Sequence, residues 1–259
     1  MIDKKVPSFY EYSSRLMLDP HSIGGNEMNL EVMTEHVTLD QIKLDICSTY
    51  EIMFKELIKM NIKFSKKELN NVAQLIQGDL NARVEQDPIA LNPLFIYKLS
   101  RSFKIIFYYR IANALFYRKE KSLKTNQICK SYAFYLSEIA TRETSIEIHP
   151  GAQIGRNFVI DHGTNTLIGA TSIIGDNCTI LNNVLLGAKS ITNNKLGKRH
   201  PTLGNNVKIA NGVQIFGPVL IGNNVKIGPN CTIHNHIPDN SIVKQVSVQS
   251  LVIDKKFSK

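Results

Sequence analysis

Aliphatic residues recur at every sixth position through most of the C-terminal half of the chain, and this repeat restricts the possible folds more than any other feature. The first group is Ile148, Ile154 and Ile160, and further groups begin at Ile168 and at Leu203. A six-residue step forms one flat side of a triangular coil, in which the aliphatic side chain points toward the axis and Gly or Asn forms the corner. The repeat therefore predicts a parallel β-helix.

Small or modest apolar side chains follow the aliphatic residues four places later and are predicted to point into the same coil. Two of them, Cys178 and Cys231, are therefore expected to be buried, reduced thiols and not nucleophiles. The four cysteines have no metal-ligand spacing, which argues against a disulfide framework and a zinc site. The predicted inward positions are Ala152, Thr164, Ser172, Cys178, Val184, Val207, Val213, Val219, Val225 and Cys231.

Two interruptions break the repeat. An interval of eight separates Ile160 from Ile168, across Asp161 and His162, and an interval of seventeen follows Leu186. Surplus residues in a solenoid must leave the coil as bulges or loops, and loops on a rigid scaffold commonly carry function. Each interruption contains a histidine, so both are candidate parts of a site.

The N-terminal half has a different pattern, which predicts helices from about residue 39 to residue 143. Ser65 and Glu68 form a capping box at the start of an apolar run with helical spacing. Other helical segments are expected at 39–60, 95–117 and 128–140. A basic flank is expected to be a solvated helix face. It consists of Lys98, Arg101, Lys104, Arg110, Arg118, Lys119 and Lys121.

These patterns predict an α+β protein with three parts. They are an N-terminal α-helical domain at 1–144, a parallel β-helix of hexapeptide repeats at 145–243, and a C-terminal tail at 244–259. No basic segment followed by a long apolar one is present, so neither a signal peptide nor a membrane span is predicted and a cytoplasmic location is expected.

The net charge of +9 is compatible with an anionic partner such as nucleic acid, an acidic membrane surface or a phosphate-bearing cofactor. No nucleic-acid-binding motif accompanies the charge, and a nucleic-acid or membrane role is not expected. Net charge alone does not choose among the remaining partners.

The motifs "EIHPGAQIG", "IDHGTN", "LGAKS" and "KRHP", behind a helical region that contains "QDP", together resemble serine O-acetyltransferase. The resemblance covers roughly residues 80 to 240. It implies that the β-helix is left-handed, as in the hexapeptide-repeat acyltransferases. It also implies acetyl transfer from acetyl-coenzyme A to the hydroxyl of L-serine.

Acyl transfer to an alcohol needs a base and a group that orients it, and the resemblance assigns these roles to His162 and Glu147. Imidazole titrates near neutrality, which suits a base. Glu147 departs from the family pattern, which has aspartate at the matching position. Its extra methylene would move the carboxylate by more than about an ångström, a distance that can matter to a catalytic pair. The neighbouring His149 is expected to be structural.

The resemblance places four residues around the amino-acid substrate. Asp161 and Asp87 would face the ammonium group, with Asp87 reaching the site from the helical domain. Arg199 and His200 would bind the carboxylate, for which their donors are suited. A neutral sugar offers these residues neither charged group.

For acetyl-coenzyme A as cosubstrate, the resemblance implies a slot between neighbouring β-helices of a homotrimer, which the helical domain could pair into a hexamer. Two segments would line it: Gly187, Ala188 and Lys189, and Ala210, Asn211 and Gly212. Lys189, Lys195 and Lys208 are candidate phosphate contacts. No metal is expected, because His234 and His236 have no further ligands nearby in sequence.

Two other functions remain open from the sequence. One is acyl transfer to a sugar or another hydroxylated acceptor, favoured by Glu147, and the other is a noncatalytic scaffold or regulatory homologue. Relatives often bind cysteine synthase through a C-terminal isoleucine, whereas this sequence ends in Lys259, so that partnership is not expected.

Overall fold

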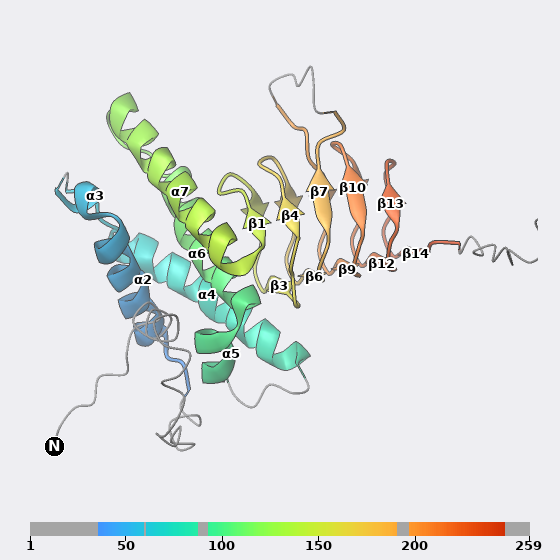
Figure 1. Ribbon diagram of the computed structural model, residues 1–259, viewed down its shortest axis with the longest axis horizontal. Coiled ribbons are helices and arrows are strands. Elements are labelled where there is room, and N and C mark those ends of the chain that lie inside the picture. The colour runs from blue at the N-terminus through green and yellow to red at the C-terminus, as the bar shows by residue number, and fades with distance from the viewer. Residues whose placement is uncertain (1–35, 60, 88–92, 191–196, 247–259) are drawn as a thin grey trace, which may run out of the picture.

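The computed structural model describes residues 36–59, 61–87, 93–190 and 197–246, in which a group of helices packs against one end of a long β-helix (Figure 1). The predicted C-terminal tail therefore lies outside the described residues beyond Val246. The helices are α2 (Leu39–Met53), α3 (Lys55–Lys59), α4 (Lys66–Gln86), α5 (Pro93–Leu99), α6 (Arg101–Phe116) and α7 (Leu123–Thr144).

The predicted capping box at the start of α4 is confirmed. The Ser65 hydroxyl accepts from the Glu68 N–H at 3.2 Å, and the Glu68 carboxylate accepts from the Ser65 N–H at 2.8 Å. Two predicted helices are each divided in the structure, at Phe54 and at Ser100. At the second break the Ser100 hydroxyl accepts from the Phe103 N–H and so begins α6 as a new helix.

The β-helix is built from three parallel sheets, one on each side of a triangular coil. Sheet A contains β1 (Glu147–Ile148), β4 (Leu167–Ile168), β7 (Leu185–Gly187), β10 (Gln214–Phe216) and β13 (Thr232–Ile233). Sheet B contains β2 (Gln153–Ile154), β5 (Ile173–Ile174), β8 (Thr202–Leu203) and β11 (Leu220–Ile221). Sheet C contains β3 (Val159–Ile160), β6 (Thr179–Ile180), β9 (Lys208–Ile209), β12 (Lys226–Ile227) and β14 (Ile242–Val243).

The predicted aliphatic positions form the axis of this coil. Ile148 pairs with Ile168, Ile168 with Leu186, and Leu186 with Ile215, and all four are buried. Equivalent residues therefore remain in register although the first of these intervals holds two surplus residues and the third holds the long interruption. The surplus leaves the coil at its corners, as the interrupted repeat predicts.

The prediction that Thr164 fills an inward position is wrong. Thr164 is only half-buried, and Thr166 takes the inward position with 1% of its surface exposed. The Thr166 hydroxyl donates to the Leu181 carbonyl at 2.9 Å and accepts from the Val184 N–H at 3.2 Å, so its burial leaves no polar group unsatisfied. The two surplus residues consequently lie before this position and enlarge the corner that carries His162.

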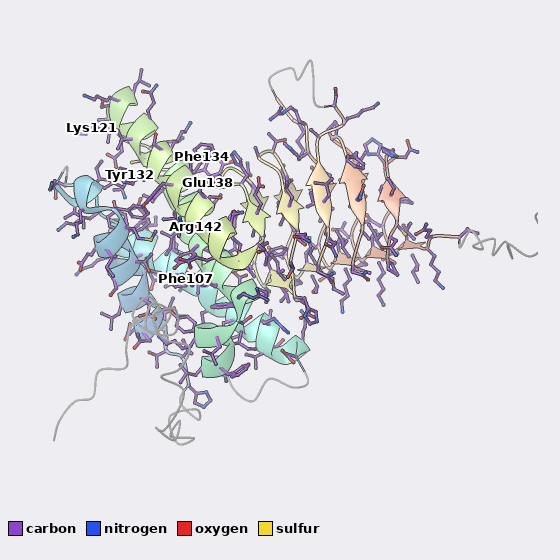
Figure 2. All side chains as sticks on the ribbon, viewed as in Figure 1. Phe107, Lys121, Tyr132, Phe134, Glu138 and Arg142 are labelled. Atoms are coloured by element: carbon purple, nitrogen blue, oxygen red, sulfur yellow. The ribbon has the colours of Figure 1, made fainter. Side chains whose placement is uncertain are left out.

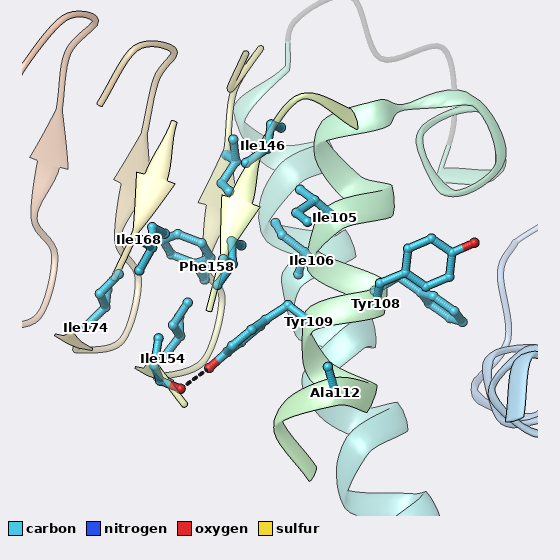
Figure 3. Packing of buried hydrophobic residues seen from close by; sticks show 14 of the residues in the cluster. Ile105, Ile106, Tyr108, Tyr109, Ala112, Ile146, Ile154, Phe158, Ile168 and Ile174 are labelled. Atoms are coloured by element: carbon cyan, nitrogen blue, oxygen red, sulfur yellow. Dashed lines mark hydrogen bonds between the residues drawn. The ribbon is translucent and has the colours of Figure 1, made fainter. Parts of the chain in front are cut away.

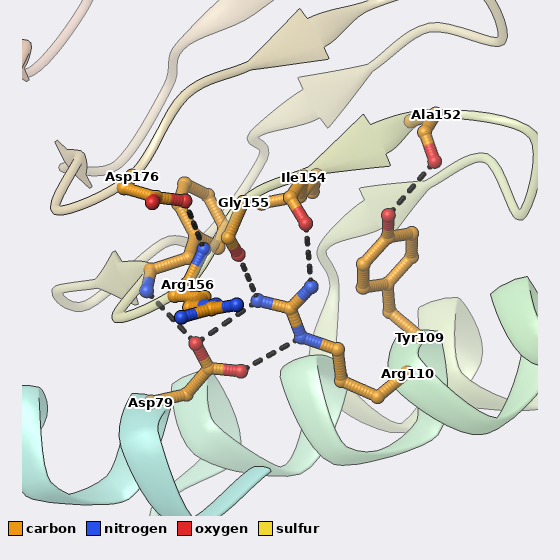
Figure 4. A network of polar contacts seen from close by, with 9 residues as sticks. Asp79, Tyr109, Arg110, Ala152, Ile154, Gly155, Arg156 and Asp176 are labelled. Atoms are coloured by element: carbon orange, nitrogen blue, oxygen red, sulfur yellow. Dashed lines mark hydrogen bonds and ion pairs between the residues drawn. The ribbon is translucent and has the colours of Figure 1, made fainter. Parts of the chain in front are cut away.

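A buried ion pair joins the helices to the first coil (Figure 4). Arg110 on α6 donates to both carboxylate oxygens of Asp79 on α4, at 2.8 and 3.0 Å, and also to the carbonyls of Ile154 and Gly155. Asp79 in turn accepts from the Phe158 N–H at 2.8 Å. Apolar side chains surround this contact, with Ile105, Ile106 and Tyr109 of α6 facing Ile146, Ile154 and Phe158 (Figure 3).

The expectation that the basic flank is solvated is therefore wrong for Arg110, Lys104 and Lys98, the last of which has a side chain only 6% exposed and pairs with Asp45 of α2. Arg110 is 4% exposed because Asp79 and the first coil surround it, and Lys104 is 8% exposed and pairs with Glu143 of α7. Helical periodicity does not reveal a second layer that packs against the charged face, so the sequence gives no sign of this burial.

Candidate active site

His162 lies in the corner between β3 and β4, where the chain makes its two-residue excursion. It is exposed and has a φ of 58°, a left-handed conformation that histidine adopts more readily than most non-glycine residues. Gly163 follows with a φ of 79°, and a Cβ there would lie 2.3 Å from the Ile160 side chain and 2.6 Å from that of Ile146. The close packing behind Gly163 holds the corner in a shape that presents the His162 imidazole to solvent.

Arg83 of α4 joins the two aspartates that the resemblance assigns to the ammonium group. Its Nη2 donates to Asp161 Oδ1 at 2.9 Å and pairs with Asp87 Oδ2 at 3.0 Å. Asp87 lies at the C-terminal end of α4, where the next residue is proline, and Asp161 directly precedes His162. Asp87 from the helices and Asp161 from the β-helix thus share one guanidinium.

The sequence reasoning missed Arg83. Arg83 and Asp87 are four residues apart on a helix, a spacing that favours an ion pair and could have drawn attention to the arginine. The contact with Asp161 spans 78 positions and has no local signature. The Arg83 side chain is 13% exposed and that of Asp161 is 36% exposed, so this contact is only partly withdrawn from water.

Glu147 lies at the start of β1 and is exposed as a residue, although its carboxylate is partly desolvated. This desolvation and the negative charge of Glu138 on α7 raise the pKa of the Glu147 carboxyl above its ordinary value. Figure 2 shows Glu138 on α7, the helix next to β1. Within the part of the chain that the structure describes, no hydrogen bond or ion pair joins Glu147 to His162.

His200 lies at a different corner, between β7 and β8, and is 7% exposed. Its Nδ1 accepts from the Thr171 N–H at 3.2 Å. Burial lowers its pKa to about 4, with the charges of Arg199, Lys198 and His149 adding to the effect. The ring is therefore neutral near pH 7, while the surrounding cations favour an anionic ligand.

Arg199 and Lys198 belong to the same corner. The Arg199 N–H donates to the Thr171 hydroxyl at 2.9 Å, and the Lys198 ammonium donates to the Pro201 carbonyl at 3.0 Å and to that of Thr171. Desolvation lowers the pKa of Lys198 to about 8. The "KRHP" segment is thus tied to the preceding coil through Thr171.

His149 has a structural contact, as the sequence predicts. Its Nδ1 accepts from the Gly151 N–H at 2.9 Å, and its ring meets the rings of Phe116 and Phe134 edge-on. Burial and the charge of Arg199 lower its pKa. These contacts connect the first coil to α6 and α7.

The predicted residues divide between two edges of the triangular β-helix. Asp161 and His162 lie on the edge where sheet C passes into sheet A, here called the C–A edge. Arg199 and His200 lie on the edge where sheet A passes into sheet B, here called the A–B edge. One side of the coil separates the two pairs within a single chain.

The predicted acetyl-coenzyme A segments divide in the same way. Gly187, Ala188 and Lys189 begin the A–B excursion, and Gly187 is buried while Lys189 is exposed. Ala210–Gly212 lies on the C–A edge, where Gly212 has a φ of 72° and a Cβ would fall 2.2 Å from Asn230. Of the candidate phosphate contacts, Lys208 is exposed on sheet C and Lys195 lies outside the described residues.

Among residues 36–59, 61–87, 93–190 and 197–246, no cluster of three or more His, Cys, Asp or Glu side chains is arranged to hold a metal ion. The helices in these same ranges include none with the length and apolar character needed to cross a membrane.

A family model matches the chain. Residues 200–235 match the model described as bacterial transferase hexapeptide (six repeats). A serine acetyltransferase from Staphylococcus xylosus is 40% identical to this chain over 168 residues, a match that covers 65% of this chain and 72% of that protein.

Solved structures have the same fold. The serine acetyltransferase isoform 3 from Entamoeba histolytica, solved in complex with cysteine, aligns with a TM-score of 0.64 at 28% identity, covering 85% of this chain and 76% of that one. A serine acetyltransferase solved in complex with CoA aligns with a TM-score of 0.64 at 24% identity, covering 90% and 92%. The predicted architecture, helices followed by a left-handed parallel β-helix, is confirmed.

Proposed function

Because the chain belongs to the serine acetyltransferase family, we propose that it transfers the acetyl group of acetyl-coenzyme A to the hydroxyl of L-serine, giving O-acetyl-L-serine and coenzyme A. The similarity to the Staphylococcus xylosus protein is the observation that carries this function. Acetylation of serine is the first step of a route to cysteine, because it turns the serine hydroxyl into a better leaving group. The acetyl group comes from a cosubstrate, and no metal takes part.

His162 acts as the general base. Its imidazole takes the proton from the serine hydroxyl as that oxygen attacks the thioester carbonyl, and the imidazolium then returns the proton to the departing thiolate of coenzyme A. The exposed, left-handed corner supports this role, because it holds an imidazole clear of the coil wall. Glu147 orients the imidazole when substrate is bound.

Asp161 and Asp87 bind the serine ammonium group, and Arg199 and His200 bind its carboxylate. Arg83 supports the first pairing, because it brings one carboxylate from α4 and one from the β-helix to the same point beside His162. The buried His200 and its cationic neighbours support the second. An acceptor with both charges fits these groups better than a neutral sugar does.

The division of the site between two edges supports assembly into a homotrimer. In such a trimer the C–A edge of one β-helix faces the A–B edge of the next, so His162 and Asp161 of one chain meet Arg199 and His200 of another. Acetyl-coenzyme A then lies in the same slot, between Gly187–Lys189 and Ala210–Gly212. The helical domain, which packs on one end of the β-helix, can pair two trimers into a hexamer.

Four free cysteines among the described residues support a reducing compartment, and we propose that the protein acts in the cytoplasm.

A thiol-release assay tests the function. Purified protein is supplied with acetyl-coenzyme A and, in separate reactions, with L-serine, with L-homoserine or with an uncharged sugar that has no amino group. Release of free coenzyme A is expected to be fastest with L-serine. Equal or faster release with the sugar, or no release with any acceptor, would contradict the proposal.

A further inference from the structure

Thr171, at the A–B corner between β4 and β5, is the residue to which the "KRHP" segment is fastened. Its hydroxyl oxygen accepts from the N–H groups of Arg199 at 2.9 Å and His200 at 3.1 Å. Its carbonyl accepts from the Lys198 ammonium. A single threonine thus binds three consecutive residues of a segment that lies 27 to 29 positions further along the chain.

The same threonine determines where the proton of the His200 ring resides. The Thr171 N–H donates to His200 Nδ1 at 3.2 Å, which requires Nδ1 to be an unprotonated acceptor. The Thr171 hydroxyl lies 2.9 Å from this Nδ1 and already accepts two N–H donors, so its own proton is directed to the nitrogen. The neutral ring must therefore carry its proton on Nε2.

Gly169 holds the opposite side of the ring. A Cβ at Gly169 would lie 2.0 Å from His200 Cδ2 and 2.2 Å from Nε2, so the ring rests directly against the glycine backbone. Thr171 and Gly169 together leave the imidazole one position and one tautomer.

We propose that Thr171 is a positioning residue for the substrate carboxylate, which acts by holding His200 as the Nε2–H tautomer and by fixing the Arg199 backbone beside it. The role rests on the proposed function. A carboxylate accepts hydrogen bonds only, so the His200 nitrogen that faces it must be a donor. In the other neutral tautomer Nε2 would present a lone pair to the carboxylate, and an attraction would become a repulsion.

Two variants separate the hydroxyl of Thr171 from its shape. Thr171→Val keeps the branched side chain and removes the hydroxyl, while Thr171→Ser keeps the hydroxyl. Thr171→Val is expected to raise KM for L-serine by roughly ten- to a hundredfold, the effect of losing a hydrogen bond to a charged group. Its kcat and its KM for acetyl-coenzyme A are expected to change by less than about threefold, because the lost hydrogen bonds are neutral and do not touch the acetyl donor. Thr171→Ser is expected to restore most of the affinity for serine.

Nitrogen NMR of protein labelled in its histidine rings reads the tautomer without any need for turnover. The His200 signals, assigned from a His200→Gln sample, are expected to show the Nε2–H form in the wild type and in Thr171→Ser. Thr171→Val keeps the backbone N–H that donates to Nδ1 but loses the hydroxyl that holds the Arg199 and His200 N–H groups, so the ring is less firmly held and a partial shift to a mixture of tautomers is expected. Thr125→Val, near the start of α7 and far from the β-helix, is the matched control and is expected to match the wild type in both measurements.

The two proposals fail separately. A wild-type His200 that carries its proton on Nδ1 would overturn the role of Thr171 even if Thr171→Val did not fold. Unchanged KM for serine in a folded Thr171→Val would also overturn it. A wild-type protein that shows the Nε2–H form but no acetylation of serine would contradict the proposed function alone.

Discussion

Arg83 on α4 and Asp161 on the β-helix are joined by a hydrogen-bonded ion pair of 2.9 Å across 78 positions of sequence. The same Nη2 pairs with Asp87, so two carboxylates that would otherwise repel each other are held together. The helical domain therefore contributes to the surroundings of the corner that carries His162, because it supplies both Asp87 and the cation that pairs with Asp161.

Replacing Arg83 by methionine is expected to raise KM for L-serine by about tenfold or more, the effect of losing a charge-assisted hydrogen bond. Without the guanidinium, Asp87 and Asp161 repel each other and no longer converge on the substrate ammonium. Steady-state kinetics with varied serine measures this change, and Arg83→Lys is expected to recover part of it. Arg142→Met, an exposed change on α7, is the control. Unaltered serine kinetics in Arg83→Met would show that the bridge has no part in binding.

His162→Ala is expected to lower kcat by about a hundred- to ten-thousandfold, the usual contribution of a general base. The His162 side chain is exposed, so removing it leaves no cavity and the fold is expected to persist. Thiol release measures the loss, and His36→Ala, at an exposed position before α2, serves as the control. Retention of wild-type kcat by His162→Ala would place the base elsewhere.

Glu147→Gln is expected to lower kcat by about tenfold to a hundredfold, because an amide orients the imidazole less well and small misplacements are costly. Glu147→Asp keeps the charge and shortens the side chain. Comparing kcat for the two variants separates charge from reach. A faster Glu147→Asp enzyme would show that the longer side chain weakens catalysis, whereas equal kcat in wild type and Glu147→Gln would remove Glu147 from the mechanism.

Stability is expected to fall as the pH is lowered from about 6.5 toward 4, and His200 is one cause. Its folded-state pKa is lowered to about 4, while an unfolded histidine titrates near 6.5, so in this window the unfolded chain binds the extra proton. Below about pH 4 both states are protonated and the contribution is fully lost. Urea denaturation at several pH values gives the free energy of unfolding at each pH. This free energy is expected to depend less steeply on pH in His200→Gln than in the wild type. Part of the slope remains, since the pKa of His149 is lowered too; identical slopes would contradict the assignment.

Arg110→Met is expected to destabilise the fold by about 3–5 kcal/mol, because it leaves the Asp79 carboxylate buried without its partner. The double change Asp79→Asn with Arg110→Met removes the stranded charge and is expected to recover part of this loss. Denaturant unfolding measures both variants. A single Arg110→Met variant as stable as the wild type would show that water reaches the site and replaces the guanidinium.

The repeat predicted the β-helix because every coil has the same local sequence pattern, with an aliphatic residue inside and Gly or Asn at a corner. The same local reading placed Thr164 in the coil, since nothing in the sequence says on which side of the inward position two surplus residues leave. Thr166 takes that position because its hydroxyl finds two backbone partners there. The sequence spacing was compatible with Thr164 or Thr166 at the inward position, and the hydrogen bonds of the folded coil select Thr166.

Contacts between distant segments were the part beyond sequence reasoning. The motif "KRHP" pointed to His200 but gave no sign of Thr171, which hydrogen-bonds to its ring, and "QDP" pointed to Asp87 but not to Arg83. The burial of Arg110 was likewise hidden, because a charged residue on a helix resembles a solvated one until the layer above it is known. Each of these contacts depends on how two segments with different local patterns meet.

The junction of Asp79 and Arg110 with the first coil also bears on how the protein avoids self-association. A stack of parallel strands has an open end, where unpaired peptide groups can recruit strands from another molecule and seed aggregates. Here Arg110 occupies the carbonyls of Ile154 and Gly155 and Asp79 occupies the N–H of Phe158, at that end of the stack. The helical domain thus covers the exposed end of the first coil. A truncated chain that began at the β-helix would leave these peptide groups unpaired and prone to aggregation.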